Sequence, residues 1–132
     1  MLPAFGNAKD LKDIEERLVE KPDDIDLLFQ RAFVLDLLGR SDSARDAYIE
    51  VIKRDGQHLG ALSNLGTLLY NAGYRSAARL TYQEALKHHP KDLPTLTNLG
   101  NALLEANELE GAKQLYEYAI GLEPQSAQAH QG

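Results

Sequence analysis

The sequence predicts an all-α solenoid in which pairs of helices stack side by side along the chain. Two strings, ALSNLGTLLYNAG (61–73) and TLTNLGNALLEAN (95–107), align without gaps, so that Leu65 in the first corresponds to Leu99 in the second. Leucines recur in both strings at the three- and four-residue spacing of an apolar helix face. No segment alternates apolar and polar residues clearly enough to predict a strand. A fixed period of this length is typical of stacked helical repeats, so we expect that architecture here.

Residues 1–24 are predicted to form an N-terminal capping helix. Pro22 lies one repeat period before Gly56, so the helix before it stands in the phase of the second helix of a pair. Its apolar stripe consists of Leu11, Ile14, Leu18 and Val19. Asp10 and Arg17 occupy positions where alanine is expected, which favours a cap because the ends of a solenoid need a polar outer face. A degenerate fourth repeat is the alternative.

Three repeats of equal length are predicted to follow, each made of two helices. They span 25–58, 59–92 and 93–126. Gly39, Gly73 and Asn107 share the repeat position between the two helices. Glycine and asparagine tolerate the left-handed conformation that closes a helix, so each of these residues is expected to end the first helix of its pair.

Ten further residues recur in phase in the second and third copies and are predicted to hold the stack together. They are Gly66, Ala78, Tyr82, Ala85 and Pro90 and, one period later, Gly100, Ala112, Tyr116, Ala119 and Pro124. Two antiparallel helices can approach closely only where side chains are short, so glycine and alanine are expected at the crossings. The tyrosines are expected to fill the space between neighbouring units. The prolines are expected to end the second helices, because proline cannot donate to the helical ladder.

The last residues, 127–132, are predicted to be the start of a truncated further repeat or a tail. No amphipathic capping helix follows residue 124, so the outward face of the last complete helix is expected to be exposed, including Tyr118 and Leu122. Exposed apolar faces mark interfaces. Two interpretations stay open: the chain is a piece of a longer array, or this end pairs with a second copy to form a homo-oligomer.

The composition is that of a folded globular protein, and it narrows the classes of partner. Of the 132 residues, 43% are hydrophobic and 26% charged, and the formal net charge is −6. Nucleic acid is excluded as the main partner, because phosphate binding needs a clustered basic surface. No apolar run approaches the roughly 20 residues of a membrane span, and the N-terminus does not resemble a signal peptide. We therefore expect no membrane contact and a cytoplasmic location.

The sequence offers no catalytic, metal or cofactor site. Cysteine is absent, which excludes disulfides and thiolate ligands. His88 and His89 are adjacent, and adjacent residues on a helix point in different directions, so they do not form a chelating pair. No Gly-rich phosphate loop is present, and no serine has a histidine partner at a recognisable spacing. We predict a protein that is not an enzyme and that carries no cofactor and no metal.

The repeated residues resemble the tetratricopeptide repeat (TPR) family, whose helix–turn–helix units are about 34 residues long, with small residues, an aromatic residue and a proline at these positions. The resemblance covers about three-quarters of the chain and implies a right-handed α-solenoid. The chain departs from the family pattern in lacking tryptophan. In the first copy, Arg31, Val51 and Gly56 stand where an aliphatic residue, alanine and proline are usual. We therefore expect the first copy to pack less tightly than the others.

The resemblance also implies where a ligand binds, because the first helices of TPR pairs line a concave groove. The expected groove residues are Phe29, Gln30, Phe33, Asn64, Thr67, Tyr70, Asn98, Asn101 and Glu105. Asn64 and Asn98 share one repeat position with Gln30, and a carboxamide can both donate to and accept from a peptide unit. This series resembles the asparagine ladder in the TPR superhelix of O-linked N-acetylglucosamine transferases.

The charges expected in the groove select against acidic ligands. The acidic groove positions are Asp26, Asp36 and Glu105. No expected groove residue is Lys or Arg, unlike the carboxylate clamp of TPR co-chaperones that bind acidic chaperone tails. We expect a neutral or mildly basic peptide with an apolar side chain resting on Phe29, Phe33 and Tyr70. One of the two phenylalanines is expected to pack against the N-terminal helix instead.

The predicted function is that of a non-catalytic scaffold which binds a peptide segment of a protein partner in its concave groove. Two alternatives stay open. The chain is the TPR portion of a larger enzyme, such as a glycosyltransferase or a methyltransferase, or it is a self-assembling TPR scaffold.

Overall fold

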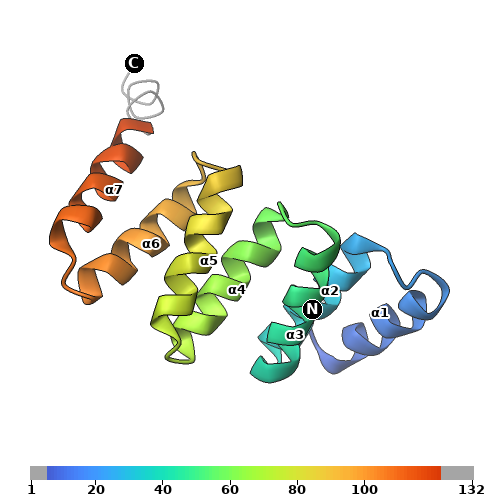
Figure 1. The fold of residues 1–132 in the computed structure, drawn as a ribbon. Helices are drawn as coiled ribbons and strands as arrows, with labels where there is room; N and C mark the ends of the chain where they lie inside the picture. Colours follow the sequence, from blue (N-terminus) through green and yellow to red (C-terminus); the bar gives the residue numbers. More distant parts are fainter. Residues whose placement is uncertain (1–5, 123–132) are drawn as a thin grey trace, which may run out of the picture.

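Seven helices make up the part of the chain that the computed structural model describes, residues 6–122, and this part contains no strand (Figure 1). The helices are α1 (Ala8–Glu20), α2 (Ile25–Leu37), α3 (Ser41–Arg54), α4 (Leu59–Asn71), α5 (Arg75–His88), α6 (Leu93–Glu105) and α7 (Leu109–Leu122). After α1 they form three pairs, α2–α3, α4–α5 and α6–α7. Pro124 and the segment 127–132 lie outside the described residues.

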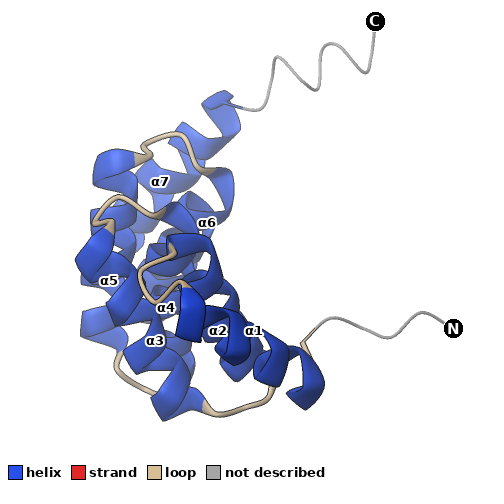
Figure 2. Cartoon of the chain, turned by 90° about the vertical axis from the view of Figure 1, so that its right-hand side faces the viewer, coloured by secondary structure: helices blue, strands red, loops and turns tan. Residues whose placement is uncertain are grey.

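The pairs stack into a curved solenoid because the first helices of successive pairs lie closer together than the second helices do. The most extensive contacts join the two helices of each pair. Between pairs, α2 approaches α4 and α4 approaches α6 with Cα atoms within 8 Å, whereas α3, α5 and α7 have no such contact with one another. The stack therefore bends toward the first helices, and Figure 2 shows α2, α4 and α6 to the right of α3, α5 and α7 along the arc. The predicted all-α, right-handed solenoid of helix pairs is confirmed.

The turns inside the three pairs have the geometry predicted from their residues. Gly39, Gly73 and Asn107 have φ values of +77°, +94° and +61°. In the first turn, the Arg40 N–H donates to the Leu35 carbonyl at 2.9 Å, and the equivalent bonds close the other two turns. These bonds satisfy carbonyls at the helix end that lack a partner within the helix. The left-handed residue thus ends each first helix and reverses the chain into the second.

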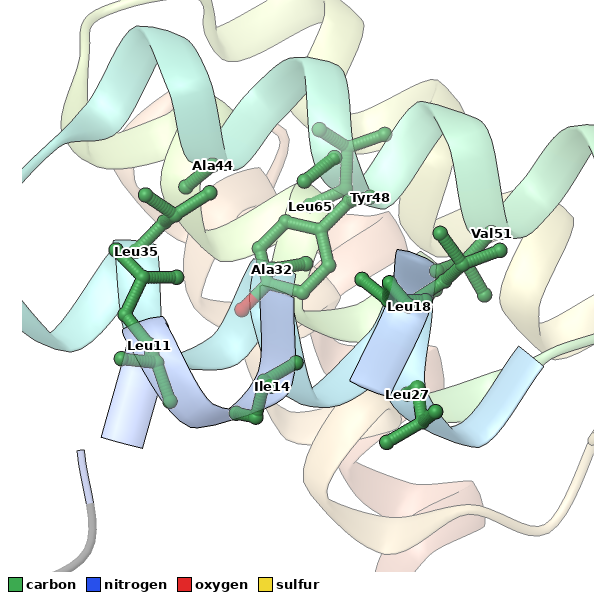
Figure 3. Packing of buried hydrophobic residues seen from close by; sticks show 14 of the residues in the cluster. Leu11, Ile14, Leu18, Leu27, Ala32, Leu35, Ala44, Tyr48, Val51 and Leu65 are labelled. Carbon is green, nitrogen blue, oxygen red and sulfur yellow. The ribbon is translucent and has the colours of Figure 1, made fainter. Parts of the chain in front are cut away.

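The hydrophobic core is continuous from α1 to α4 and centres on the first pair, where Figure 3 shows the Tyr48 ring among side chains from several helices. The fully buried residues of this pair are Ala32, Val34, Ala44, Tyr48 and Val51. The first copy, which was expected to pack less tightly, thus has more buried hydrophobic residues than either later copy. Its second helix is enclosed between the neighbouring helices of the stack, and Val51 fills space where the later copies have alanine. In α7, by contrast, only Ala112 and Ala119 are buried.

The repeat alanines are buried, as is Tyr82, whereas Tyr116 is half-buried and Pro90 is exposed. Ala78 and Ala85 have no exposed surface, and Tyr82 is 3% exposed. Tyr82 forms a second core cluster with Ala78 and with Leu99 of the next pair, so it does fill the space between units. Pro90 follows α5, which ends at His88.

The N-terminal helix α1 begins with a capping box. The Asn7 side chain accepts from the Asp10 N–H at 3.0 Å, and the Asp10 carboxylate accepts from the Asn7 N–H at 3.2 Å. Asp10 occupies a repeat position where alanine is expected, and its carboxylate caps the N-terminus of α1 instead. Leu11, Ile14 and Leu18 of the predicted stripe are buried, but Val19 is 81% exposed, so its assignment to the stripe was wrong.

The first helices of the three pairs start with equivalent caps, but the cap of α4 is a histidine. Asp24, His58 and Asp92 each accept a hydrogen bond from the backbone N–H three residues later. The His58 bond, from the Ala61 N–H to Nδ1, is 3.0 Å long.

We expect His58→Ala to lower the free energy of unfolding by about 1 kcal/mol, because it removes the cap of α4. His58→Asp keeps an acceptor and adds the charge that a helix N-terminus favours, so it should restore most of that loss. Urea denaturation of the two variants checks this. Equal stability of wild type and His58→Ala would show that the cap does not contribute.

Candidate functional site

An apolar stripe runs along the inner face of the first pair. Phe29, Phe33 and Leu37 follow one another at four-residue spacing on α2, so they share one helix face. The Phe29 and Phe33 rings are stacked, with centroids 6.4 Å apart. Phe33 is 37% exposed and Leu37 is 54% exposed. This half-exposed surface can receive an apolar side chain.

Phe29 is the half-buried end of the stripe, and its ring contacts residues of both the first and the second pair. Its ring centroid lies 4.7 Å from that of His58 and 6.2 Å from that of Tyr48. A Cβ on Gly60 would come within 2.8 Å of the Phe29 ring, so the absence of a side chain on α4 makes room for it. Phe29 therefore joins the first pair to the second. It supports Phe33 more than it offers free surface.

The repeat tyrosines reach the inner wall with their hydroxyl groups. Tyr48 donates to Asp36 at 2.8 Å, and the hydroxyls of Tyr82 and Thr67 are 2.8 Å apart. Tyr116 donates to the Oδ1 of Asn101. Three expected groove positions are thus hydrogen-bonded within their own helix pair. Thr67 and Asn101, two of the predicted contact residues, help to hold the second helix against the first.

The carboxamides predicted to form a ladder differ in how free they are. Asn64 interacts with the hydroxyl of Tyr48, so its side chain is partly engaged. Gln30 and Asn98 are half-buried, and their side chains form no hydrogen bond with any described residue. A half-buried carboxamide with free donor and acceptor capacity is suited to bind a peptide unit. Gln30 and Asn98 are therefore the stronger candidates of the three.

Tyr70 and Glu105 are held together at the far end of the inner wall. The Tyr70 hydroxyl donates to the Glu105 carboxylate, which raises the pKa of that hydroxyl. Arg75, at the start of α5, lies 3.4 Å from the same carboxylate and places its guanidinium 5.0 Å from the centre of the Tyr70 ring. One face of Tyr70 is therefore covered by a cation. Arg75 was not among the predicted groove residues, because it lies on a second helix and the TPR groove positions lie on first helices.

A buried polar network joins α4 to α6. The hydroxyls of Ser63 and Thr95 are 2.6 Å apart, and Thr95 also donates to Asp92 at 2.6 Å. Thr95 is fully buried and is the only buried polar residue among those described. The repeat position of Ser63 faces the groove in the TPR pattern, but here its hydroxyl is turned toward the next pair. It fixes the spacing of α4 and α6 and is not free to bind a ligand.

The histidines and carboxylates that the structure describes do not gather into a metal site. No group of three or more such side chains is placed to hold an ion within residues 6–122. His88 lies near Glu84, and His89 contacts the carbonyl of Gln57 at 2.6 Å. No helix in this range has the length and hydropathy of a membrane span.

Comparison with known families identifies the repeat. Two tetratricopeptide repeat family models match, one over residues 37–92 and the other over residues 81–114. Together they cover 37–114, which is more than half of the chain. The chain belongs to the tetratricopeptide repeat family. The predicted TPR resemblance is confirmed, and a role in protein interactions follows from it, since TPR pairs are interaction modules. No curated protein matches the sequence.

Solved structures with the same TPR fold include several MamA proteins. A crystal structure of MamA protein superposes with a TM-score of 0.81 at 15% identity, over 91% of this chain and 66% of that chain. MamA (41-end) from Desulfovibrio magneticus RS-1 gives 0.78 at 22% identity, over 88% and 66%. A further MamA crystal structure gives 0.79 at 18% identity, over 94% and 77%. The chain thus spans just under two thirds of the length of the first two, and at these identities the likeness concerns the fold.

Proposed function

We propose that this TPR module is a non-catalytic scaffold that binds an extended peptide segment along its inner wall. The observation that carries the proposal is the exposed stripe of Phe33 and Leu37 beside the unengaged carboxamide of Gln30. An apolar side chain of the peptide rests on the stripe, while Gln30 and Asn98 bind its backbone. Aromatic anchors of this kind commonly dominate the affinity of an interface.

The charge of the inner wall favours a neutral or mildly basic ligand. Asp26 is exposed beside the stripe and forms no ion pair with any described residue. Asp36, which accepts from Tyr48, places a second carboxylate next to Leu37. At the other end, Arg75 offsets Glu105. The acidic character is therefore concentrated at the first pair, and a Lys or Arg of the peptide is expected to lie there.

A matched pair of peptides tests this proposal. The probes are fluorescein-labelled, serine-rich octapeptides with a central Leu-Phe, flanked by Lys in one and by Glu in the other. We expect the Lys peptide to bind more tightly, and Phe33→Gln and Asn98→Ala each to weaken it by about tenfold, as expected for the loss of a contact residue of an interface. Fluorescence anisotropy gives the dissociation constants.

Leu80→Gln, on the outer side of the solenoid, is the control, because it changes an exposed apolar residue far from the inner wall. It should leave the affinity of the Lys peptide unchanged. Equal affinity of wild type and Phe33→Gln, or tighter binding of the Glu peptide, would refute the inner wall as the binding surface.

A further inference from the structure

A second apolar surface lies on the outer side of the solenoid, between α3 and α5. The two helices form the walls of a cleft of about 330 Å³, and α4 forms its floor. The cleft, called here the outer cleft, is lined by Ile49, Ile52, Lys53, Leu62, Leu65, Leu80, Thr81 and Glu84. Leu80 is 66% exposed and Ile49 is 36% exposed. An exposed apolar surface of this kind needs an explanation.

The other copies show that the stack itself does not require these apolar walls. The repeat position of Ile49 is held by Gln83 in α5 and by Glu117 in α7. The position of Leu80 is held by Asp46 in α3 and by Gln114 in α7. Polar residues at these positions are compatible with the same helix pair, so the apolar walls are particular to the outer cleft.

The neighbouring cleft between α1 and α3 provides a second comparison. It has Arg31 on its floor where the outer cleft has Leu65, and Glu15 and Glu50 on its walls. Arg31, which replaces the aliphatic residue usual in the family, thus lies in a cleft that also contains two glutamates. Of the two clefts, the outer cleft is the one suited to an apolar ligand.

The occupant that fits the outer cleft is a helix. Its walls and floor are helix surfaces whose backbone groups bond within their own helices, and no carboxamide lines it. The hydroxyl of Thr81 already donates to the Ala77 carbonyl at 2.8 Å. An extended segment would bury backbone groups without partners, whereas a helix satisfies its own. An amphipathic helix also presents side chains at three- and four-residue spacing to such a trough.

The two walls of the outer cleft carry opposite charges and so distinguish the two flanks of that helix: Lys53 lies on the α3 wall and Glu84 on the α5 wall. The Oε2 of Glu84, on the α5 wall, is buried and has no hydrogen-bond donor among the described residues. The Nε2 of His88 lies 3.6 Å away, beyond hydrogen-bond length. The Glu84 side chain as a whole is 42% exposed, so a cation on a bound partner can approach its carboxylate from the solvent side. The matching group is a Lys or Arg.

We propose that the outer cleft binds an amphipathic helix of a partner protein, whose apolar stripe is flanked by Lys or Arg on the side that faces α5. This surface is separate from the inner wall and does not depend on peptide binding there.

Two helical peptides test the proposal. They are lactam-stapled amphipathic helices, each about four turns long with a Leu and Ile stripe; one carries Arg along one flank, and the other carries Glu at the same positions. We expect the Arg helix to bind, with amide chemical-shift changes confined to α3, α4 and α5. Leu80→Gln, which introduces the residue found at this position in the third copy, should weaken binding by about tenfold. Glu84→Gln should reduce the preference for the Arg helix over the Glu helix.

Val19→Gln is the control, because Val19 is an exposed apolar residue on α1, away from the outer cleft. It should bind the Arg helix as the wild type does, and circular dichroism should show all variants equally folded. The proposal is overturned if neither helix binds at millimolar concentration, if the shifts map to the inner wall, or if Leu80→Gln has no effect. If the Glu84→Gln variant still prefers the Arg helix as strongly as the wild type does, the basic flank of the partner does not face Glu84, and that part of the proposal is wrong.

Discussion

Tyr48→Ala is expected to lower the free energy of unfolding by about 3–5 kcal/mol, the range for truncating a large aromatic residue in a core. The Tyr48 ring is fully buried in the cluster that spans α1 to α4. Its hydroxyl joins Asp36 of α2 to Asn64 of α4. The substitution therefore leaves a cavity and two polar groups without this partner. Guanidinium denaturation followed by circular dichroism measures the loss.

Tyr116→Ala is the matched control, since it truncates the tyrosine at the same repeat position in the last pair. Tyr116 is only half-buried, so less apolar surface leaves water when it packs. The cost should be clearly smaller than for Tyr48→Ala. Equal losses in the two variants would contradict the conclusion that the core centres on the first pair.

The hydroxyl of Tyr48 can be tested separately through pH. Burial, together with the hydrogen bond to Asp36, raises the pKa of Tyr48 well above its ordinary value of 10.0. The folded chain therefore keeps this hydroxyl neutral while the unfolded chain ionises it. Its contribution to stability is complete below pH 10 and is lost as the pH rises beyond that value. Tyr48→Phe should show a smaller fall in unfolding free energy between pH 8 and pH 11 than the wild type.

Gly66→Leu is expected to lower the free energy of unfolding by about 2–3 kcal/mol, because it overpacks the crossing of α4 and α5. A Cβ at Gly66 would lie 2.6 Å from Cε1 and 2.7 Å from Cδ1 of the Tyr82 ring. Tyr82 is itself 3% exposed and hydrogen-bonded to Thr67, so it has little room to move. Thermal unfolding checks the effect.

Gly121→Leu controls for the change of residue type within a helix. No described atom lies within 4 Å of a Cβ built at Gly121, so the new side chain meets no obstacle. Leucine is also a better helix former than glycine. We expect this variant to be as stable as the wild type or more stable. If Gly66→Leu were equally well tolerated, the close approach of Gly66 to Tyr82 would have no role in stability.

The fold could be predicted from the sequence because the features that specify it are local and repeated. The repeat period sets the length of a pair, and Gly39, Gly73 and Asn107 mark the left-handed turns. The burial of Tyr82 and Ala85 follows from their positions within the repeat. The relative burial of the three copies could not be predicted in this way. The first copy matches the repeat pattern least but has the most buried hydrophobic residues, because burial depends on how many neighbours enclose a helix.

The candidate site was predicted only as a set of positions. The sequence places Phe33, Asn98 and Tyr70 on first helices, and the stacking of those helices brings them to one wall. It does not show that Tyr70 is bound by Glu105 and covered by Arg75. The contact between Tyr70 and Glu105 joins two different helix pairs, and no local pattern specifies it.

By itself, the sequence determined the helical repeat, its turns and the apolar character of each helix face, because these follow from backbone conformation and periodicity within one unit. Only the tertiary structure decided which polar groups remain free and which apolar groups remain exposed. Gln30 and Asn98 are unengaged whereas Asn64 is not, and Leu80 lines an open cleft, because these properties depend on the neighbouring pair that each side chain meets.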